Sequence, residues 1–359
     1  MSEGRTRSRT RAWQAGLGIV ALLAMAGVVP AAAQSPAAGT TITKMAYISP
    51  EAATDKGWNE QGAKGAQAAA DAAGVELIMA DNSGYDDPAP ILGNLKDDGA
   101  QFIVAQAGGY ATTAAQFAKD NSIPTVVFDQ PPLTTPGLVA DIETDSQQGG
   151  YLAGVLAALT TKTGTVGIVI SADDPNWHKQ AGGFAAGAKA TKPDIKILQA
   201  QIGPAGYGDA EGGKTTTATV IAGGADVIFG MGDGSSFGML GAIENATLPA
   251  GADKVWFIDV IGDKSDPATD PNGVLLSSVL WDFAGTYTQA LADLAAGTFG
   301  SAGYTLDAAN GGIKMLQTDK ISADTWTALE AAAAGIADGS ITVPVTPTQA
   351  DVDAIVNAQ

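Results

Sequence analysis

Short apolar runs rich in Val, Ile and Phe alternate along the chain with Ala-rich segments of helical length. From about Lys44 the predicted order is strand 44–49, helix 57–73, strand 75–80, helix 88–97, strand 102–106, helix 111–120, strands 125–129 and 138–142, and helix 146–160. The strands are apolar throughout rather than alternating in polarity, which is typical of parallel strands covered on both faces. The pattern therefore predicts an α/β chain built on a parallel sheet.

The same alternation starts again after residue 164. The second series is predicted as strand 165–171, helix 178–191, strand 195–201, helix 210–222, strand 226–232, helix 236–245 and strand 255–260. Residues 99–110 (GAQFIVAQAGGY) align with residues 224–235 (GADVIFGMGDGS), so that strand, glycine turn and helix start fall in register. We therefore expect two similar α/β lobes.

The first 33 residues have the layout of a secretory signal peptide. All four arginines of the chain precede an apolar stretch of about 15 residues, residues 15–29, which is followed by Pro30 and Ala31-Ala32-Ala33. This stretch is shorter than the about 20 residues that a membrane-spanning helix needs. We expect cleavage after Ala33, with residues 34–41 following as a flexible tether.

Composition excludes several classes of protein. Without residues 1–33 the chain holds 15 Lys, no Arg and 37 Asp and Glu, a net charge near −22. Binding of nucleic acid requires clustered Lys and Arg to neutralise phosphates, so no nucleic-acid partner is expected. The absence of Cys leaves no residue for a lipid anchor at the cleavage site, so we expect a periplasmic protein that is not lipid-anchored. With one His and no Cys, we expect no metal site and no cofactor.

Polar and glycine-rich turns follow the predicted strands. Ligands of open parallel sheets lie outside the carboxyl ends of the strands. If the two lobes face each other through these ends, the turns line one cleft. The candidate ligand-binding residues are Asp55, Trp58, Asn59, Gly108, Asp129, Trp177, His178, Asp209, Asp233, Asp259 and Trp281.

Trp58 and Asn59 stand in the turn TDKGWNEQG, where the first helix begins. An indole at a strand-to-helix turn offers a flat face to a heteroaromatic base or to the apolar face of a sugar, and the amide offers both a donor and an acceptor. Alternatively, the indole seals the helix against its lobe and Asn59 is a solvated residue of the first turn. Both interpretations stay open at this stage.

The strand-terminal acids and the only His also have two interpretations. The carboxylates of Asp129 and Asp259 can accept hydrogen bonds from adjacent hydroxyls of a polyol or ribose, or they can simply cap their strands. Trp177 and His178 open a predicted helix and would supply a second ring from the opposite lobe, or His178 is a surface residue at a helix start.

One formal motif points to a different function. Residues 208–215 (GDAEGGKT) match the G-x-x-x-x-G-K-[ST] phosphate loop of nucleoside triphosphatases. Asp209 and Glu211 place two carboxylates inside that loop, however, where phosphates would have to bind. We expect instead that Asp209 caps the helix that follows. Paired carboxylates for glycoside or nucleoside hydrolysis remain an alternative in so acidic a chain.

Several runs are similar to the basic membrane protein family of solute-binding proteins. Residues 151–169 (YLAGVLAALTTKTGTVGIV) resemble the YLAGxLAAxxTKTGKVGxV signature of that family, and residues 55–59 (DKGWN) resemble its D-x-G-[FW]-N motif. Further similarity lies in residues 183–189, 192–194 and 224–229, and the resemblance covers about residues 44–280 in the right order. The last 75 or so residues match only loosely.

The resemblance implies a type I periplasmic-binding-protein fold, with two Rossmann-like lobes and three crossing segments, that delivers a ligand to an ABC importer. Characterised members bind mostly purine nucleosides. The resemblance assigns base stacking to Trp58, a ligand hydrogen bond to Asn59, and the ribose to Asp129 and Asp259. Nucleoside-binding members typically carry a Lys where this chain has Trp281, and a sugar or a free base would need no such cation.

We therefore predict a solute-binding receptor and not an enzyme. The expected partners are a small ligand, most simply a purine nucleoside or nucleobase, and the permease subunits of an ABC transporter. A pentose or hexose receptor of the same fold, a secreted hydrolase and a sensor subunit are the alternatives. We expect a monomer with residues 42–142 and 261–302 in the N-terminal lobe, residues 146–260 and 303–356 in the other, and crossings near 143–145, 260–262 and 300–304.

Overall fold

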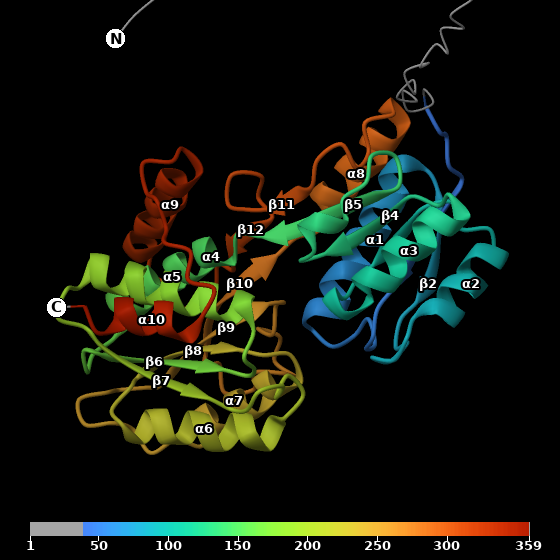
Figure 1. Cartoon of the computed structure of the whole chain (residues 1–359). Helices are drawn as coiled ribbons and strands as arrows, with labels where there is room; N and C mark the ends of the chain where they lie inside the picture. Colours follow the sequence, from blue (N-terminus) through green and yellow to red (C-terminus); the bar gives the residue numbers. More distant parts are fainter. Residues whose placement is uncertain (1–38, 359) are drawn as a thin grey trace, which may run out of the picture. The chain divides into compact units, whose positions relative to one another are not determined.

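The computed structural model describes residues 39–358, so the predicted signal peptide and most of the tether lie outside the described residues (Figure 1). None of the described helices combines the length and the apolar character that crossing a membrane requires.

The order of elements follows the predicted alternation closely, usually to within one or two residues at each end. The first series is β1 (Lys44–Ile48), α1 (Trp58–Ala73), β2 (Glu76–Ala80), α2 (Ala89–Asp97), β3 (Ile103–Ala105), η1 (Gly108–Tyr110), α3 (Ala111–Asn121), β4 (Thr125–Phe128), η2 (Pro131–Leu133), β5 (Val139–Thr144) and α4 (Ser146–Thr160). The second is β6 (Thr165–Ile170), α5 (Pro175–Thr191), β7 (Lys196–Gln201), α6 (Ala210–Ala222), β8 (Val227–Met231), α7 (Gly234–Glu244) and β9 (Trp256–Ile261). The remainder is β10 (Leu275–Trp281), α8 (Ala284–Ala296), β11 (Tyr304–Leu306), β12 (Ile313–Met315), α9 (Ala323–Ala337) and α10 (Gln349–Val356).

These strands form two six-stranded sheets. The first has the order β11-β5-β4-β3-β1-β2 and the second the order β12-β10-β9-β8-β6-β7. All pairings are parallel except that of β12 with β10, which is antiparallel. The predicted α/β fold with two lobes and parallel sheets, of the type I periplasmic-binding-protein kind, is confirmed.

Helices cover both faces of each sheet, which explains why the strands are apolar throughout. In the first sheet, α2 and α3 pack on one face, and α1 and α8 lie together on the other. In the second sheet, α6 and α7 pack on one face, while α4 and α5 pack on the other (Figure 1). We call the first sheet with α1, α2, α3 and α8 the first lobe, and the second sheet with its remaining helices the second lobe.

Helix ends follow local rules that the sequence carries. Helix α1 ends at Gly74, which adopts the left-handed conformation, and the Gly74 N–H bonds to carbonyls of the last turn. Helix α5 begins with Pro175 in its first turn, and the Asp174 carboxylate accepts hydrogen bonds from the N–H groups of Asn176 and Trp177. The second of these signals fixes where one of the cleft-forming turns lies.

The last third of the chain is distributed between the sheets differently from our expectation. Strand β10 lies in the second sheet beside β9, although residues 261–302 were expected in the N-terminal lobe. Strand β11 pairs with β5 in the first sheet, although residues 303–356 were expected in the other lobe. The chain therefore changes sheet after β5, between β10 and α8, and between β11 and β12. The expectation was wrong because the sheet that a strand joins depends on residues elsewhere in the chain. The apolar character of the strand itself does not specify that sheet.

Candidate functional site

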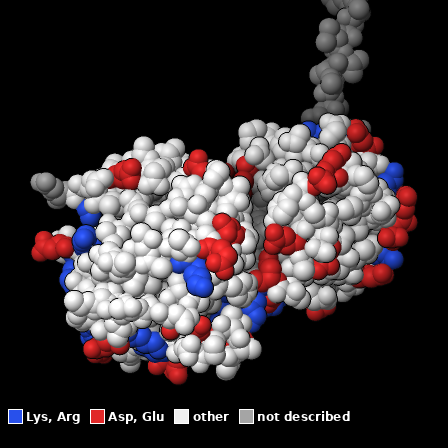
Figure 2. All heavy atoms as spheres, turned by 90° about the horizontal axis from the view of Figure 1, so that it is seen from below, with Lys and Arg blue, Asp and Glu red and all other residues white. Residues whose placement is uncertain are grey.

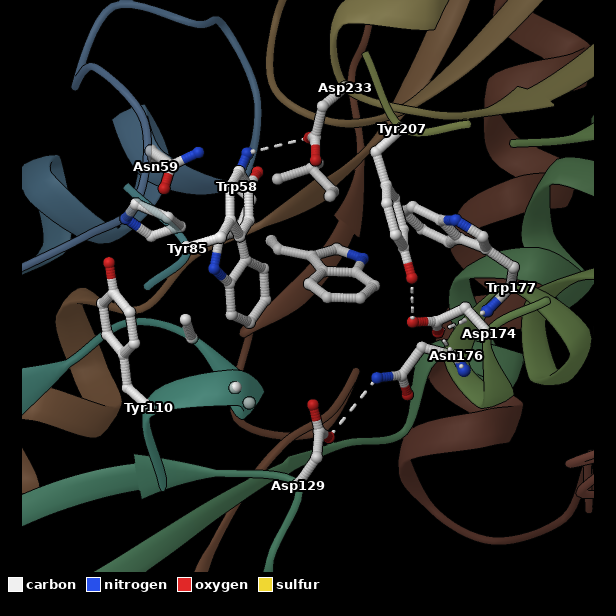
Figure 3. Close-up of a pocket in the computed structure, with 16 residues that line it drawn as sticks. Trp58, Asn59, Tyr85, Tyr110, Asp129, Asp174, Asn176, Trp177, Tyr207 and Asp233 are labelled. Carbon is white, nitrogen blue, oxygen red and sulfur yellow. Dashed lines mark hydrogen bonds between the residues drawn. The ribbon is translucent and has the colours of Figure 1, made fainter. Parts of the chain in front are cut away.

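A cleft of about 300 Å³ lies between the two lobes (Figure 3). Its volume is at the lower end of the range of about 300–1,000 Å³ that is usual for small-ligand sites. The first lobe contributes residues that follow β1 to β4, and the second lobe residues at or beyond the ends of β6 to β10. The lining residues are Pro50, Trp58, Asn59, Tyr85, Ala107, Gly108, Gly109, Tyr110, Asp129, Asp174, Asn176, Trp177, Tyr207, Asp233, Ile261 and Trp281.

This lining agrees with the rule that ligands of parallel sheets bind outside the carboxyl ends of the strands. Of the eleven predicted residues, seven line the cleft: Trp58, Asn59, Gly108, Asp129, Trp177, Asp233 and Trp281. The lining includes several aromatic rings and three carboxylates but no Lys, Arg or His. Figure 2 shows acidic side chains on both sides of the groove between the lobes.

Trp58 is the first residue of α1 and is half-buried. Its Nε1–H donates to the Gln106 carbonyl at 2.8 Å, and its ring makes edge contacts with Phe128 and Phe283 at centroid distances of 5.3 and 5.2 Å. A third edge contact, at 5.7 Å, joins it to Trp281 of the second lobe. Trp58 therefore combines the two roles that the sequence left open: it packs on its own lobe and it lines the cleft.

Trp58→Ala is expected to lower both ligand affinity and stability. Loss of a half-buried indole and of its hydrogen bond costs about 2–3 kcal/mol in the free energy of unfolding, less than the about 3–5 kcal/mol for a fully buried ring. Trp58→Phe keeps a flat face and should retain more of both quantities. Urea unfolding and calorimetric titration of the two variants measure the effects. An unchanged unfolding free energy in Trp58→Ala would contradict the packing role.

Asp55 and Asn59 organise the start of α1. The Asp55 carboxylate accepts hydrogen bonds from the N–H groups of Gly57, Asn59 and Glu60 at 2.9–3.1 Å, and from the Asn59 side-chain amide at 2.6 Å. These bonds satisfy donors that a helix start leaves free. Asp55 is therefore a structural cap that does not line the cleft, whereas Asn59, only 2 % exposed, lines it while its amide also holds Asp55.

The opposite wall is built from the turn before α5 and from the loop after β7. Tyr207 donates its hydroxyl proton to Asp174 at 2.8 Å, and the Trp177 indole N–H donates to the Ser171 hydroxyl at 3.0 Å. The Trp177 and Trp281 rings are tilted neighbours at 6.4 Å between centroids. This wall is therefore a connected set of rings in which the polar atoms of Tyr207 and Trp177 are already bonded.

Asp129 follows β4 in a left-handed backbone conformation, with φ of 55°. Asn176 of the second lobe donates its side-chain N–H to Asp129 Oδ1 at 3.3 Å, as the dashed line in Figure 3 shows. The pKa of Asp129 is raised to about 6, chiefly because the carboxylate is desolvated between the lobes; the Asn176 bond acts against this rise and the nearby Asp174 adds to it. The pair Asp129–Asn176 thus links the lobes at the edge of the cleft.

A second set of contacts between the lobes lies in the loop between β9 and β10. Lys264 is fully buried, 2.6 Å from Asp259 Oδ2, and it donates to the Lys56 carbonyl of the first lobe at 2.9 Å. The Lys56 ammonium in turn bonds to Asp266 and to the Thr269 hydroxyl. This loop therefore holds the turn that precedes α1.

Backbone strain marks the same region. Ile261, which lines the cleft at the end of β9, has φ of 70°, and Lys56 has φ of 55°. Positive φ is a genuine outlier for a β-branched residue, and such strain of about 1–3 kcal/mol per residue persists where the surrounding structure imposes it, often at binding sites. The strained positions therefore support the cleft as the functional site.

Three further predicted residues do not line the cleft. His178 is only 2 % exposed and lies 2.7 Å from Asp173, because its helix turns the imidazole away from the cleft. Asp209 caps α6 by accepting the Gly212 N–H at 2.8 Å. Asp259 is fully buried, where it accepts the Ser236 hydroxyl at 2.8 Å and pairs with Lys264. The ribose contact that the resemblance assigned to Asp259 is therefore blocked in this arrangement.

Four further lining residues belong to strand-end turns that the sequence predicted at the cleft, although they were not among the eleven candidates: Gly109, Tyr110, Asp174 and Asn176. The lining residues that were not predicted are Pro50, Tyr85, Ala107, Tyr207 and Ile261. Tyr85 and Tyr207 each follow a glycine in the loop after β2 or β7, so the strand-end rule applied to every strand would have included them. No sequence pattern predicted Ile261 as a lining residue, because its position in the cleft depends on its backbone conformation.

Comparison with known proteins identifies the family. Residues 42–346 match the family model described as ABC transporter substrate-binding protein PnrA-like. The ABC transporter nucleoside-binding protein BmpA of Lactococcus lactis is 33% identical over 250 residues, which is 65% of this chain and 68% of that protein. Basic membrane protein A of Borreliella afzelii is 28% identical over 243 residues, 66% of this chain and 71% of that protein.

Solved structures support the fold. An ABC transporter solute-binding protein from Conexibacter woesei superposes with a TM-score of 0.70 at 20% identity, covering 85% of this chain and 99% of that one. The arabinose-binding protein AraP of Geobacillus stearothermophilus superposes with a TM-score of 0.58 at 18% identity, covering 77% and 97%. Together with the match over residues 42–346, these similarities show that the chain belongs to the PnrA-like family of ABC transporter substrate-binding proteins.

Proposed function

We propose that this substrate-binding protein captures a purine nucleoside or nucleobase between its two lobes and delivers it to the permease of an ABC importer. The observation that carries the proposal is the cleft itself, in which aromatic rings and hydrogen-bonding groups from the carboxyl ends of both sheets converge. Flat rings stack on heteroaromatic bases, and the carboxylates accept hydrogen bonds from ligand N–H and O–H groups. The printed name of the Lactococcus lactis relative, a nucleoside-binding protein, supports the same ligand class.

Binding works by shifting an equilibrium between open and closed lobes. Only the closed arrangement contacts the ligand from both sides, so the ligand stabilises it, and the permease recognises the closed face. We place the hinge where the chain changes sheet: near Asp145, at residues 282–283 and at residues 307–312. No bond in the ligand is made or broken.

The proposal also covers where the protein acts and its oligomeric state. The protein is exported by its signal peptide and acts as a free monomer outside the cytoplasmic membrane. Its formal net charge of −19 and its cleft without cationic side chains agree with a small-molecule ligand rather than nucleic acid.

Direct recovery of ligand tests the proposal. The chain without residues 1–33 is incubated with a mixture of purine nucleosides, nucleobases and pentoses, passed through a desalting column, and denatured so that mass spectrometry identifies what was bound. We expect one unchanged purine per protein, together with a higher melting temperature in its presence. Release of free base plus ribose would instead indicate a hydrolase.

A sugar is the second candidate ligand. Asp129 and Asp233 each have an oxygen that can accept from adjacent hydroxyls, and an indole such as Trp281 also packs against the apolar face of a sugar ring. Recovery of a pentose or hexose in place of a purine would establish this alternative within the same family and the same cleft.

A further inference from the structure

Asp233 occupies the N-cap position of α7, yet its side chain does not cap that helix. An aspartate at this position normally accepts a hydrogen bond from an N–H of the first helical turn. Here Oδ1 accepts instead from the backbone N–H of Trp58, across the cleft at 3.3 Å (Figure 3). Gly57 permits this approach, since a Cβ at that position would lie 2.5 Å from Oδ1. The carboxylate therefore points to the cleft, and the first turn of α7 is left without a side-chain cap.

The second oxygen of Asp233 has no hydrogen-bond partner within the described part of the chain, and the residue lines the cleft. The pKa of Asp233 is raised to about 7, first by burial and then by the negative charge of Asp55, while Lys264 and the Trp58 N–H act in the opposite direction. Lys264 is already engaged by Asp259 and by the Lys56 carbonyl. The ionised carboxylate therefore lacks a full set of donors until a ligand supplies one.

Two indole rings give this part of the cleft flat, uncharged surfaces. Trp58 and Trp281 meet edge to face beside Asp233, and the Trp281 indole N–H is a buried donor without a partner among the described residues. Two other carboxylates, Asp129 and Asp174, also belong to the lining. A planar ligand that carries a hydrogen-bond donor, an acceptor and no negative charge would complement this combination.

We propose that Asp233 accepts a hydrogen bond from an amino group of the ligand, so that the cleft prefers amino-substituted purines to the matching purines without that group and rejects phosphorylated forms. This inference rests on the proposed function. An analogue without the amino group leaves a buried carboxylate unpaired, which is costly. A phosphate adds negative charge beside three carboxylates, which selects against nucleotides by repulsion.

Two matched ligand pairs test the inference by calorimetric titration at about pH 8, where the Asp233 carboxylate is ionised. Adenosine and purine riboside differ only in the 6-amino group, and guanosine and inosine differ only in the 2-amino group. We expect the amino member of at least one pair to bind about 10-fold or more tightly, and adenosine monophosphate to bind about 100-fold or more weakly than adenosine.

Protein variants assign the effect to Asp233. In Asp233→Ala the preference within the pair should fall to about 3-fold or less, because the acceptor is gone. Asp233→Asn keeps the shape and a neutral acceptor, and it should bind adenosine monophosphate more tightly relative to adenosine than the parent protein does. The matched control is Asp253→Ala, since Asp253 is an exposed residue before β9, at the end of the strand away from the cleft. It should leave all the ratios unchanged.

The outcomes separate this inference from the proposed function. Equal affinities within both pairs, or a preference that persists in Asp233→Ala, would overturn the inference while leaving purine binding intact. If none of the nucleosides or nucleobases binds, the purine proposal fails and the role of Asp233 fails with it. Melting curves of each variant verify folding. If Asp233→Ala does not fold, Asp233→Asn decides the matter through the ratio of adenosine monophosphate to adenosine affinity, and an unchanged ratio would overturn the inference.

Discussion

Lys264→Met is expected to lower the free energy of unfolding by about 3–5 kcal/mol. Lys264 and Asp259 are both fully buried, with 2.6 Å between Nζ and Oδ2. Without the ammonium, the Asp259 carboxylate keeps only the Ser236 hydroxyl as a side-chain partner, and the Lys56 carbonyl loses its donor. An uncompensated buried charge is one of the few single changes with so large an effect. It would remove a substantial part of the about 5–15 kcal/mol that stabilises a typical domain.

Urea unfolding of three variants isolates the cause. The double variant Lys264→Met with Asp259→Asn removes both charges and should recover much of the loss, since a neutral amide costs less to bury than a lone carboxylate. Lys64→Met is the matched control, because Lys64 is a largely exposed lysine paired with Glu60 on the surface of α1. Its effect should stay within about 0.5 kcal/mol. A loss below about 1 kcal/mol in Lys264→Met would show that water reaches Asp259.

Gly262→Ala is expected to weaken ligand binding by about 5- to 150-fold, the equivalent of about 1–3 kcal/mol for an overpacked contact. A Cβ at Gly262 would lie 2.0 Å from the Lys56 carbonyl oxygen and 2.7 Å from its carbon, both backbone atoms of the other lobe. The β9–β10 loop would have to move away from the turn before α1. The closed arrangement would then be less populated, and apparent affinity falls with the fraction of binding-competent protein.

The expected signature is a change in affinity with little change in the stability of the lobes themselves. Each lobe has its own sheet and its own helices, and Gly262 lies where they touch, so the urea unfolding curve should shift little. Gly241→Ala is the control, because its added Cβ on α7 meets nothing within 4 Å. Small-angle X-ray scattering with and without ligand would detect impaired closure. Affinity equal to that of the parent protein would show that closure does not require this close contact.

Both variants alter the same contact, which joins the loop between β9 and β10 to the turn before α1. The loop after β9 begins with the strained Ile261, continues through Gly262, and reaches Lys264, which links Asp259 to the turn before α1. That turn then presents Trp58 to the cleft, where its backbone N–H meets Asp233. The contacts between the lobes and the residues that line the cleft therefore lie on the same two segments, the β9–β10 loop and the turn before α1. A change in how the lobes close consequently changes the arrangement of the ligand site.

The sequence by itself determined the local architecture. Apolar runs without alternation predicted the parallel strands from β1 to β9, and the Ala-rich segments predicted the helices between them, because these preferences depend on neighbouring residues. The strand-end rule also placed Trp58, Asp129 and Asp233 at one site, since the carboxyl ends of parallel strands share an edge, and comparison with the family pattern added Trp281. The runs at residues 151–169 and 55–59, with the shorter similar segments, indicated the family.

Only the tertiary structure decided which of those polar groups remain available. Asp55 and Asp259 were candidate ligand-binding residues, but the carboxylate of Asp55 is occupied by helix N–H groups and that of Asp259 by Lys264. Asp209 caps its helix, as the sequence predicted. Asp233 occupies a position where a cap is expected, yet it points across the cleft. Strands β10 and β11 also exchanged lobes relative to the expectation. Asp233 meets Trp58 across 175 positions of the chain, and Tyr304 of β11 pairs with Ile142 of β5. Contacts between residues so far apart leave no periodic signal in the sequence.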